Sequence, residues 1–169
     1  MGSPIKCNLK FQEAHPKIIV MNYTSLLSPT GPLTLFEEAG EIIAVEWGQT
    51  KGGSETPLLH EAKDQISQYF ARERQIFELP LNPKGTEFQK AVWQQMLEIP
   101  YGQTKTYGAL AKNLKSAARA VGGACGKNPI PIIIPCHRVM GANGKLTGFS
   151  GGEGVATKEA LLRLESFAT

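Results

Sequence analysis

The feature that most constrains this chain is a short apolar run that ends in a cysteine and a histidine. Residues 129–134 read Pro-Ile-Pro-Ile-Ile-Ile, and Pro135-Cys136-His137-Arg138-Val139 follows directly. A thiol at the end of such a run is expected in a dry pocket rather than on open surface. Because a neighbouring imidazole can hold or take the thiol proton, the pair is suited to form a nucleophilic thiolate. For an isolated Cys-His pair, a buried structural cysteine is the alternative interpretation.

Further motifs surround this pentapeptide. Together they resemble the active-site region of the methylated-DNA–protein-cysteine alkyltransferases, which repair O6-alkylguanine. The resemblance is strong from about Gly85 to Glu165 and weaker before that. The segments that carry it are Ala117-Ala118-Arg119-Ala120-Val121-Gly122-Gly123-Ala124, Gly126-Lys127-Asn128-Pro129-Ile130-Pro131, Pro135-Cys136-His137-Arg138-Val139 and Thr147-Gly148-Phe149-Ser150-Gly151-Gly152.

The 169 residues suit one ordinary domain or two small ones. No apolar run approaches the roughly 18 residues of a membrane span, and Lys6 and Lys10 interrupt any signal-peptide pattern. The cysteines at 7, 125 and 136 are odd in number and widely spaced, which argues against a disulfide framework. We therefore expect a reducing compartment, cytoplasmic or nuclear. We also expect a monomer without a membrane partner.

Charge is distributed unevenly along the chain. Residues 1–80 carry 7 basic and 10 acidic side chains, whereas residues 81–169 carry 11 basic and 5 acidic ones. No acidic residue occurs between Glu98 and Glu153, a stretch that holds seven bases. Such a stretch is typical of a surface that faces phosphates, although solvated lysine faces are also common. The bases are Lys105, Lys112, Lys115, Arg119, Lys127, Arg138 and Lys145.

The first part of the chain predicts strands and one helix. The residues 17–23 form a β-rich run, and those at 33–36 and 42–47 predict a hairpin around Glu37–Glu41. Residues 49–55 predict a loop, and 58–70 a helix. Two prolines and a glycine in 80–85 indicate a linker, so we expect domains over 1–80 and 86–169 with a linker at 81–85.

The second part predicts mostly helices. Thr86 is an expected N-cap, and Phe88, Val92, Trp93, Met96 and Leu97 would form a core stripe. Two shorter helices over 107–114 and 116–125 are compatible with a helix-turn-helix. The resemblance implies an α/β fold: a small ribonuclease-H-like sheet domain followed by a helical, winged-helix-like DNA-binding domain.

Glu165 is the best candidate for a third member of a Cys136-His137-acid relay. At 100° per residue, Glu165 falls on the apolar side of the helix over 156–165, between Leu161 and Leu162. A carboxylate there needs a partner, and it could fix the imidazole tautomer of His137. A solvent-exposed helix end is the alternative. The resemblance matches Glu165 to the relay glutamate of the family, where a water bridges histidine and cysteine.

Other roles rest mainly on the resemblance. Asn128, a natural turn-former, would be a hinge between the helix-turn-helix and the cysteine loop. Tyr107 would rotate the target nucleotide and assist guanine as a leaving group by donating a proton. Arg119 would fill the base stack after the guanine is flipped out, on a helix whose small residues enter the minor groove. Helix–helix packing is the alternative for those small residues. The remaining DNA-facing candidates are Ala117, Ala118, Gly122 and Lys105.

The substrate pocket is also implied by the resemblance. Val139 and Ser150 match positions that read guanine through backbone groups, and Pro131, Met140 and Phe149 would be apolar walls. Phe149 departs from the more usual tyrosine, so a hydroxyl contact is lost there. Cys125 is expected to be a small core or helix-face residue. Because the first part offers only Cys7, His15 and His60, we predict no zinc and no other cofactor.

The implied function is single-turnover repair of O6-alkylguanine, and of O4-alkylthymine, in double-stranded DNA. Cys136 would accept the alkyl group irreversibly. A non-catalytic alkyltransferase-like lesion-binding protein is one alternative, but such proteins lack the cysteine. A sequence-reading transcription regulator would need more polar side chains than Arg119 on residues 117–124. A Cys-His hydrolase, the third alternative, would turn over many substrates.

Overall fold

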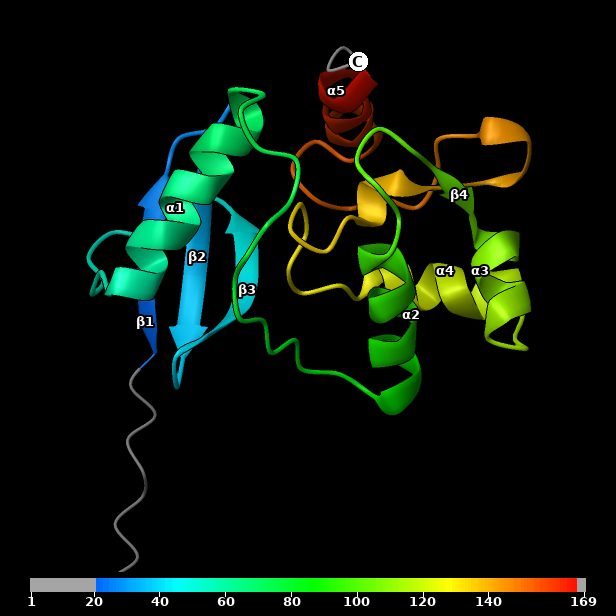
Figure 1. Cartoon of the computed structure of the whole chain (residues 1–169), viewed down its shortest axis with the longest axis horizontal. Helices are drawn as coiled ribbons and strands as arrows, with labels where there is room; N and C mark the ends of the chain where they lie inside the picture. Colours follow the sequence, from blue (N-terminus) through cyan, green and yellow to red (C-terminus); the bar gives the residue numbers. More distant parts are fainter. Residues whose placement is uncertain (1–20, 167–169) are drawn as a thin grey trace, which may run out of the picture.

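The computed structural model describes residues 21–166, which form two adjoining domains (Figure 1). The N-terminal domain contains a three-stranded antiparallel sheet with helix α1 (Pro57–Phe70) packed across it. Its strands lie in the order β1 (Asn22–Leu26), β2 (Leu33–Glu38) and β3 (Glu41–Trp47). Of the predicted strand over 17–23, residues 17–20 lie outside the described part, and Asn22 and Tyr23 belong to β1.

The predicted β2–β3 hairpin is confirmed, with a tighter turn than expected. The strands continue to Glu38 and resume at Glu41, so Ala39 and Gly40 alone form the loop. Their φ angles are 51° and 79°. Two left-handed residues make a turn whose twist matches that of the flanking strands.

Helix α1 begins after Thr56, whose hydroxyl accepts a hydrogen bond from the Leu59 amide at 3.1 Å. This cap satisfies one of the amides that the first helical turn leaves without a partner. Leu59, Ile66 and Tyr69 are buried on one face of the helix. The helix predicted over 58–70 is therefore confirmed, one residue longer at its start.

The predicted linker lies along the edge of the sheet. The Ile42 amide donates to the Pro80 carbonyl at 2.9 Å, and the Asn82 amide donates to the Ile42 carbonyl at 2.8 Å. Farther along β3, the Val45 amide donates to the Pro129 carbonyl at 2.9 Å. The edge strand β3 is thus covered by the linker and by the loop that leads to Cys136, which protects its backbone groups from pairing elsewhere.

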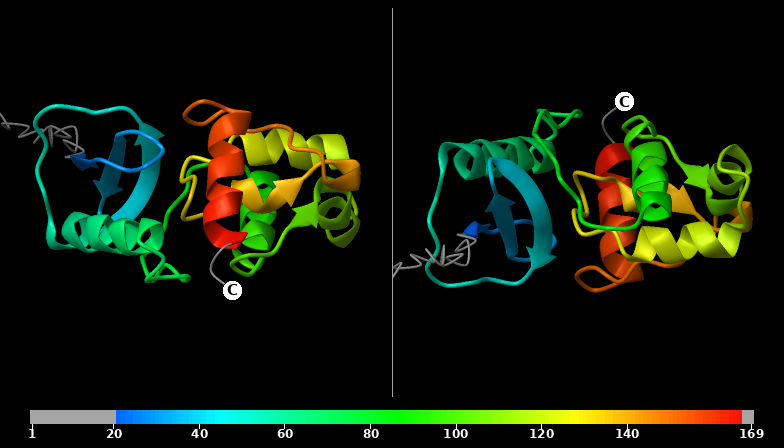
Figure 2. Two further views of the ribbon diagram at one scale, coloured as in Figure 1. Left: turned by 90° about the horizontal axis from the view of Figure 1, so that it is seen from above. Right: turned by 90° about the horizontal axis from the view of Figure 1, so that it is seen from below.

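The C-terminal domain is mostly helical, and Figure 2 shows it beside the sheet domain from two further sides. Two short strands in it pair in parallel, β4 (Lys105–Thr106) with β5 (Val139–Met140). Two short 3₁₀ helices, η1 (Cys136–Arg138) and η2 (Ala142–Gly144), flank β5. The α-helices are α2 (Glu87–Leu97), α3 (Tyr107–Asn113), α4 (Ala118–Gly126) and α5 (Val155–Ser166).

Helix α2 confirms its predicted cap and most of its core stripe. Thr86 and Gln89 form a reciprocal capping box, and Val92, Trp93 and Met96 are buried. The prediction was wrong for the two residues at the margins, because Phe88 and Leu97 are 37% and 41% exposed. At 100° per residue both lie roughly 90° from the centre of the buried stripe.

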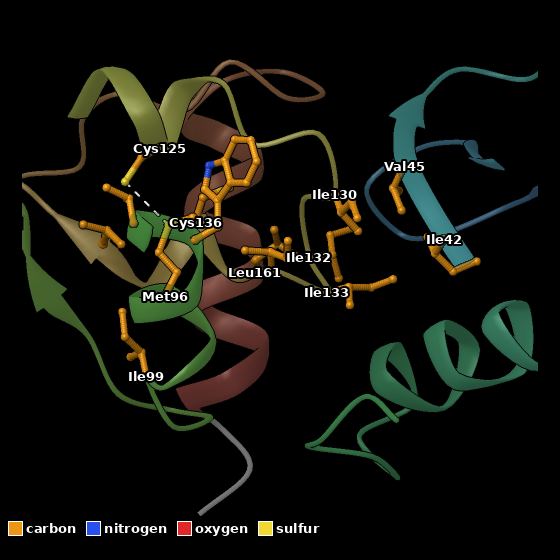
Figure 3. Packing of buried hydrophobic residues seen from close by; sticks show 14 of the residues in the cluster. Ile42, Val45, Met96, Ile99, Cys125, Ile130, Ile132, Ile133, Cys136 and Leu161 are labelled. Carbon is orange, nitrogen blue, oxygen red and sulfur yellow. Dashed lines mark hydrogen bonds between the residues drawn. The ribbon is translucent and has the colours of Figure 1, made fainter. Parts of the chain in front are cut away.

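The two helices predicted for a helix-turn-helix are α3 and α4, with ends shifted by one or two residues. They pack against each other, and α4 also packs on α2. The Trp93 indole N–H donates to the Ala124 carbonyl at 2.9 Å, which ties α2 to α4. The residues before Cys136 extend the core toward the sheet: Figure 3 shows Ile130 and Ile133 on the side that faces β3, which carries Ile42 and Val45.

Candidate active site

Cys136 begins η1 at the end of the buried run, and its residue surface is 9% exposed. It lines a cavity of about 540 Å³ to which both domains contribute. The volume lies within the usual range for small-molecule sites. The predicted pocket at Cys136 is therefore present. From the N-terminal domain, β3 contributes Ala44, Val45, Glu46 and Trp47 to the cavity wall.

Asn128 fixes the loop that carries the cysteine. Its side-chain amide donates to the Ile134 carbonyl at 2.9 Å, and its Oδ1 accepts from the Ile130 amide at 3.0 Å. The Asn128 side chain also acts to lower the pKa of the Cys136 thiol, against the larger effect of burial. Asn128, two residues after α4, thus connects to both ends of the apolar run.

His137 and Glu165 form a buried pair. His137 Nε2 lies 2.7 Å from Glu165 Oε1, and the two side chains are 0% and 1% exposed. Burial opposes ionisation of Glu165, but the hydrogen bonds from His137 and Arg138 outweigh it and lower its pKa to about 2. Since the ionised carboxylate can only accept, Nε2 carries the proton. In the neutral imidazole, Nδ1 is then the basic nitrogen.

The His137 ring does not bond the thiol directly. Nδ1 is buried and has no hydrogen-bond partner within residues 21–166. Burial lowers the pKa of His137, despite its bond to Glu165, and burial raises the pKa of Cys136 against the effects of Asn128 and Lys158. These two directions favour the neutral thiol over the thiolate in the absence of substrate. The stable pair is a neutral thiol with a neutral imidazole.

Glu165 has further partners that the sequence did not reveal. Arg138 Nε lies 3.2 Å and 3.0 Å from the two carboxylate oxygens, and its Nη2 donates to Oε1 at 2.8 Å. Arg138 Nη1 donates to the Ile99 carbonyl at 2.8 Å. The Tyr69 hydroxyl, from α1, donates to Oε1 at 2.8 Å. Arg138 was counted among the phosphate-facing bases, and this was wrong, because its side chain is buried as the main counter-ion of Glu165. The other six bases of that stretch are exposed.

Lys158 is a second buried cation that sequence reasoning missed. It is 0% exposed, and its Nζ donates to the Val139 carbonyl and, at 2.8 Å, to the Thr147 carbonyl. Its ammonium lies 5.7 Å from the centre of the Tyr107 ring. Burial lowers the pKa of Lys158. A signal was available: on α5, Lys158 lies three residues before Leu161 and seven before Glu165, on the same face.

Tyr107 and Gly148 line a second cavity, on the helical face. The second cavity measures about 470 Å³, and Gly148 also lines the cysteine cavity. The Tyr107 hydroxyl donates to the Thr147 carbonyl at 2.9 Å, and burial raises the pKa of Tyr107 to about 12. The predicted DNA-facing residues Ala118, Arg119 and Gly122 line this second cavity. Two further predicted DNA-facing residues are exposed nearby: Ala117, which directly precedes α4, and Lys105, which lies in β4.

The predicted substrate residues divide into two groups. Pro131, Phe149 and Ser150 line the cysteine cavity, whereas Val139 and Met140 do not. Val139 is fully buried and its carbonyl accepts from Lys158. Cys125 is buried, as expected, with its Sγ 3.5 Å from Met96 Sδ (Figure 3), yet it also lines the cysteine cavity. Burial raises the pKa of Cys125 to about 12, and Cys7 and His15 lie outside the described residues.

Two family descriptions match nearly the whole chain. The "6-O-methylguanine DNA methyltransferase, ribonuclease-like domain" matches residues 21–83, and the "DNA binding domain" of the same family matches residues 87–167. The chain belongs to the 6-O-methylguanine DNA methyltransferase family. The α/β fold implied by the resemblance, a ribonuclease-like sheet domain followed by a helical domain, is thereby confirmed.

Curated members of this methyltransferase family are similar along their full length. A methylated-DNA–protein-cysteine methyltransferase of Methanosarcina acetivorans is 46% identical over 86% of this chain and 98% of its own. A constitutive methylated-DNA–protein-cysteine methyltransferase of Bacillus subtilis is 43% identical over 85% of this chain and 94% of its own length.

Solved structures also match this chain over most of its length. The Mycobacterium tuberculosis O6-methylguanine methyltransferase superposes with a TM-score of 0.77 at 41% identity, covering 89% of this chain and 95% of that one. The M. tuberculosis protein in complex with DNA gives a TM-score of 0.79 at 43% identity, covering 87% of this chain and 94% of that one.

Within this methyltransferase fold, the cysteine site joins both domains and draws on several distant segments. Tyr69 comes from α1, Asn128 from the end of α4, Cys136 and His137 from η1, and Glu165 from α5. Within residues 21–166, no helix is long and apolar enough to cross a membrane.

Proposed function

We propose that this chain repairs O6-alkylguanine in double-stranded DNA by moving the alkyl group onto Cys136 Sγ, once per molecule. The observation that carries the proposal is the cavity at Cys136, backed by the buried His137–Glu165 pair, in a chain of the 6-O-methylguanine DNA methyltransferase family. O4-alkylthymine has the same kind of alkyl–oxygen bond and is a second substrate. Because the reaction needs a reduced thiol, the protein works in the cytoplasm or the nucleus. One molecule carries the whole site, so we propose that it acts as a monomer.

The protonation states of the site residues support this chemistry. The thiol proton passes to His137 Nδ1, through a water as the family resemblance implies, and the ionised Glu165 stabilises the imidazolium that forms. The thiolate then attacks the alkyl carbon in line with O6. The C–S bond forms as the C–O6 bond breaks, and the electron pair leaves on guanine. Burial of Cys136 disfavours the thiolate at rest, so the thiolate forms when the substrate is in place.

Guanine leaves more readily if it receives a proton. Tyr107 is the candidate donor, as the family resemblance implies, because its phenol carries a proton at neutral pH. It lines the second cavity with Gly148, which also lines the cavity at Cys136. The product at Cys136 is a thioether, which has no leaving route under mild conditions. The protein is consumed by the reaction and needs no cofactor.

DNA binds on the face formed by α3 and α4. The exposed bases on this side neutralise phosphates, and the small residues of α4 allow its backbone to approach the minor groove closely. The base must leave the stack to reach a buried thiol, and Arg119 fills the gap it leaves. The presence of Cys136 argues against a non-catalytic lesion binder, and the small residues of α4 argue against sequence reading.

A duplex in which O6-methylguanine blocks cleavage by a restriction endonuclease tests the proposal. We expect cleavage to be restored in proportion to the protein added, one duplex per molecule. Cys136→Ser should bind the duplex but restore nothing, and Cys7→Ser, which changes a cysteine outside the described residues, is the control that should restore it fully. Restoration of many duplexes per molecule would instead indicate a hydrolase, and restoration by Cys136→Ser would overturn the assignment of the acceptor.

A further inference from the structure

One wall of the cavity around Cys136 is supported by the other domain. Residues 148–152 form this wall, and Trp47 from β3 of the N-terminal domain supports it. The Trp47 and Phe149 rings meet edge to face, with centres 5.9 Å apart and planes at 82°. Such a pair contributes about 0.5–1.5 kcal/mol beyond the area it buries.

Two glycines bring this wall against the indole. A side chain at Gly151 would overlap the six-membered ring of Trp47, and a Cβ at Gly152 would come within 3.1 Å of Trp47 Nε1. Gly152 also has a φ of 54°, in the left-handed region. The space where a side chain of residue 151 would stand is therefore already occupied by the indole.

The indole itself is held from its own domain. Trp47 Nε1 donates a hydrogen bond to Thr30 Oγ1, in the N-terminal domain, at 3.3 Å. Trp47, Phe149 and Gly151 all line the cavity together with Cys136. A glycine-rich segment has little rigidity of its own, so an aromatic anchor decides where it stays.

We propose that Trp47 is a specificity-determining residue for alkyl transfer. By holding residues 148–152 as one wall of the Cys136 cavity, it limits the size of the O6-alkyl group that reaches the thiol. The N-terminal domain thereby sets the alkyl range of a reaction carried out by the C-terminal domain. This inference rests on the proposed transfer to Cys136.

The test compares two substrates in the same duplex sequence, O6-methylguanine and O6-benzylguanine. Trp47→Ala opens the space of one indole, so we expect the ratio of the benzyl to the methyl transfer rate to rise about tenfold, within the usual range for a pocket change of this kind. Trp47→Phe keeps a ring against Phe149 and should stay within roughly twofold of the wild-type ratio. Phe88→Ala, an exposed aromatic residue on α2 outside both cavities, is the control and should leave the ratio unchanged.

A double-mutant cycle separates the wall from a general loss of stability. Gly151→Ala should raise the ratio in the wild-type background, because its methyl group displaces the segment from the indole, and should add nothing in Trp47→Ala. An unchanged or lower ratio for Trp47→Ala would overturn the inference. If that variant does not fold by far-ultraviolet circular dichroism, Trp47→Leu takes its place with the same criterion. Failure of the wild-type protein to transfer methyl would refute the proposed function instead.

Discussion

The Tyr69 hydroxyl, on α1 of the N-terminal domain, donates a hydrogen bond to Glu165 Oε1 on α5 across 2.8 Å. The same oxygen lies 2.7 Å from His137 Nε2 and accepts from Arg138. Both Tyr69 and Glu165 are buried, and burial together with the nearby Glu165 carboxylate raises the pKa of the phenol, so Tyr69 remains a donor. The sheet domain therefore supports the polar cluster behind the cysteine directly.

Tyr69→Phe removes this one bond and keeps the ring. Because a hydrogen bond to a charged group contributes about 1.5–3 kcal/mol, the free energy of unfolding measured in urea should fall by that amount. Methyl transfer should slow, but by less than in Glu165→Gln. Tyr23→Phe is the matched control, since its hydroxyl bonds the Lys51 carbonyl in an exposed position. An equal loss of stability in both variants would contradict a special role for Tyr69.

Glu165→Gln tests the relay. The amide cannot hold the imidazolium as a carboxylate does, so transfer should slow while affinity for the duplex is kept. Replacement of His137 by Gln should act in the same direction, and the two changes should not be additive in the transfer rate. Glu165→Gln leaves Arg138 without its counter-ion, which could destabilise the fold. Circular dichroism should therefore show that the variant is folded before its transfer rate is measured. Transfer at the wild-type rate by a folded Glu165→Gln would remove Glu165 from the mechanism.

The resting state of Cys136 can be titrated. Burial raises its pKa above the ordinary value of 9.0, so the thiolate fraction at neutral pH is smaller than for a free cysteine. The rate at which iodoacetamide labels the Cys136 peptide should therefore rise with pH to a midpoint above 9.0. The same peptide in urea is the control and should show the ordinary midpoint. A folded-state midpoint near 7 would mean that the thiolate is already formed before substrate binds.

The sequence predicted local features well because each depends on near neighbours. The β2–β3 hairpin follows from two β-rich runs, the α2 cap from Thr86, and the inward position of Glu165 from helical periodicity. Long-range pairing could not be predicted in this way. Arg138 was assigned to the surface from its charge, and its burial depends on a carboxylate 27 residues away.

The contribution of the N-terminal domain to the site was missed for the same reason. Tyr69 and Glu165 are 96 residues apart, and Trp47 meets Phe149 only once the two domains pack together. No local pattern marks either pair. Lys158 was also missed, but its position on the buried face of α5 could have been calculated from helical periodicity.

Arg119→Ala separates base flipping from chemistry. The side chain is exposed on α4 beside the second cavity, away from the lining of the cysteine cavity. Transfer from duplex O6-methylguanine should fall markedly, because the base stack is no longer held open, while reaction with free O6-benzylguanine should stay nearly unchanged. Lys127→Ala is a suitable comparison, since it removes one exposed charge and should only weaken phosphate binding. An equal loss on duplex and free base would instead assign Arg119 to the fold.

The most direct test of the account is the mass of the intact protein after incubation with excess O6-methylguanine duplex. We predict a gain of one methyl group, about 14 Da, on every active molecule, because the thioether cannot turn over. Peptide mapping should place the group on Cys136, with Cys125 and Cys7 unmodified. A protein whose mass is unchanged after the duplex has been repaired, or a methyl group found on another cysteine, would contradict the assignment of Cys136 as the acceptor.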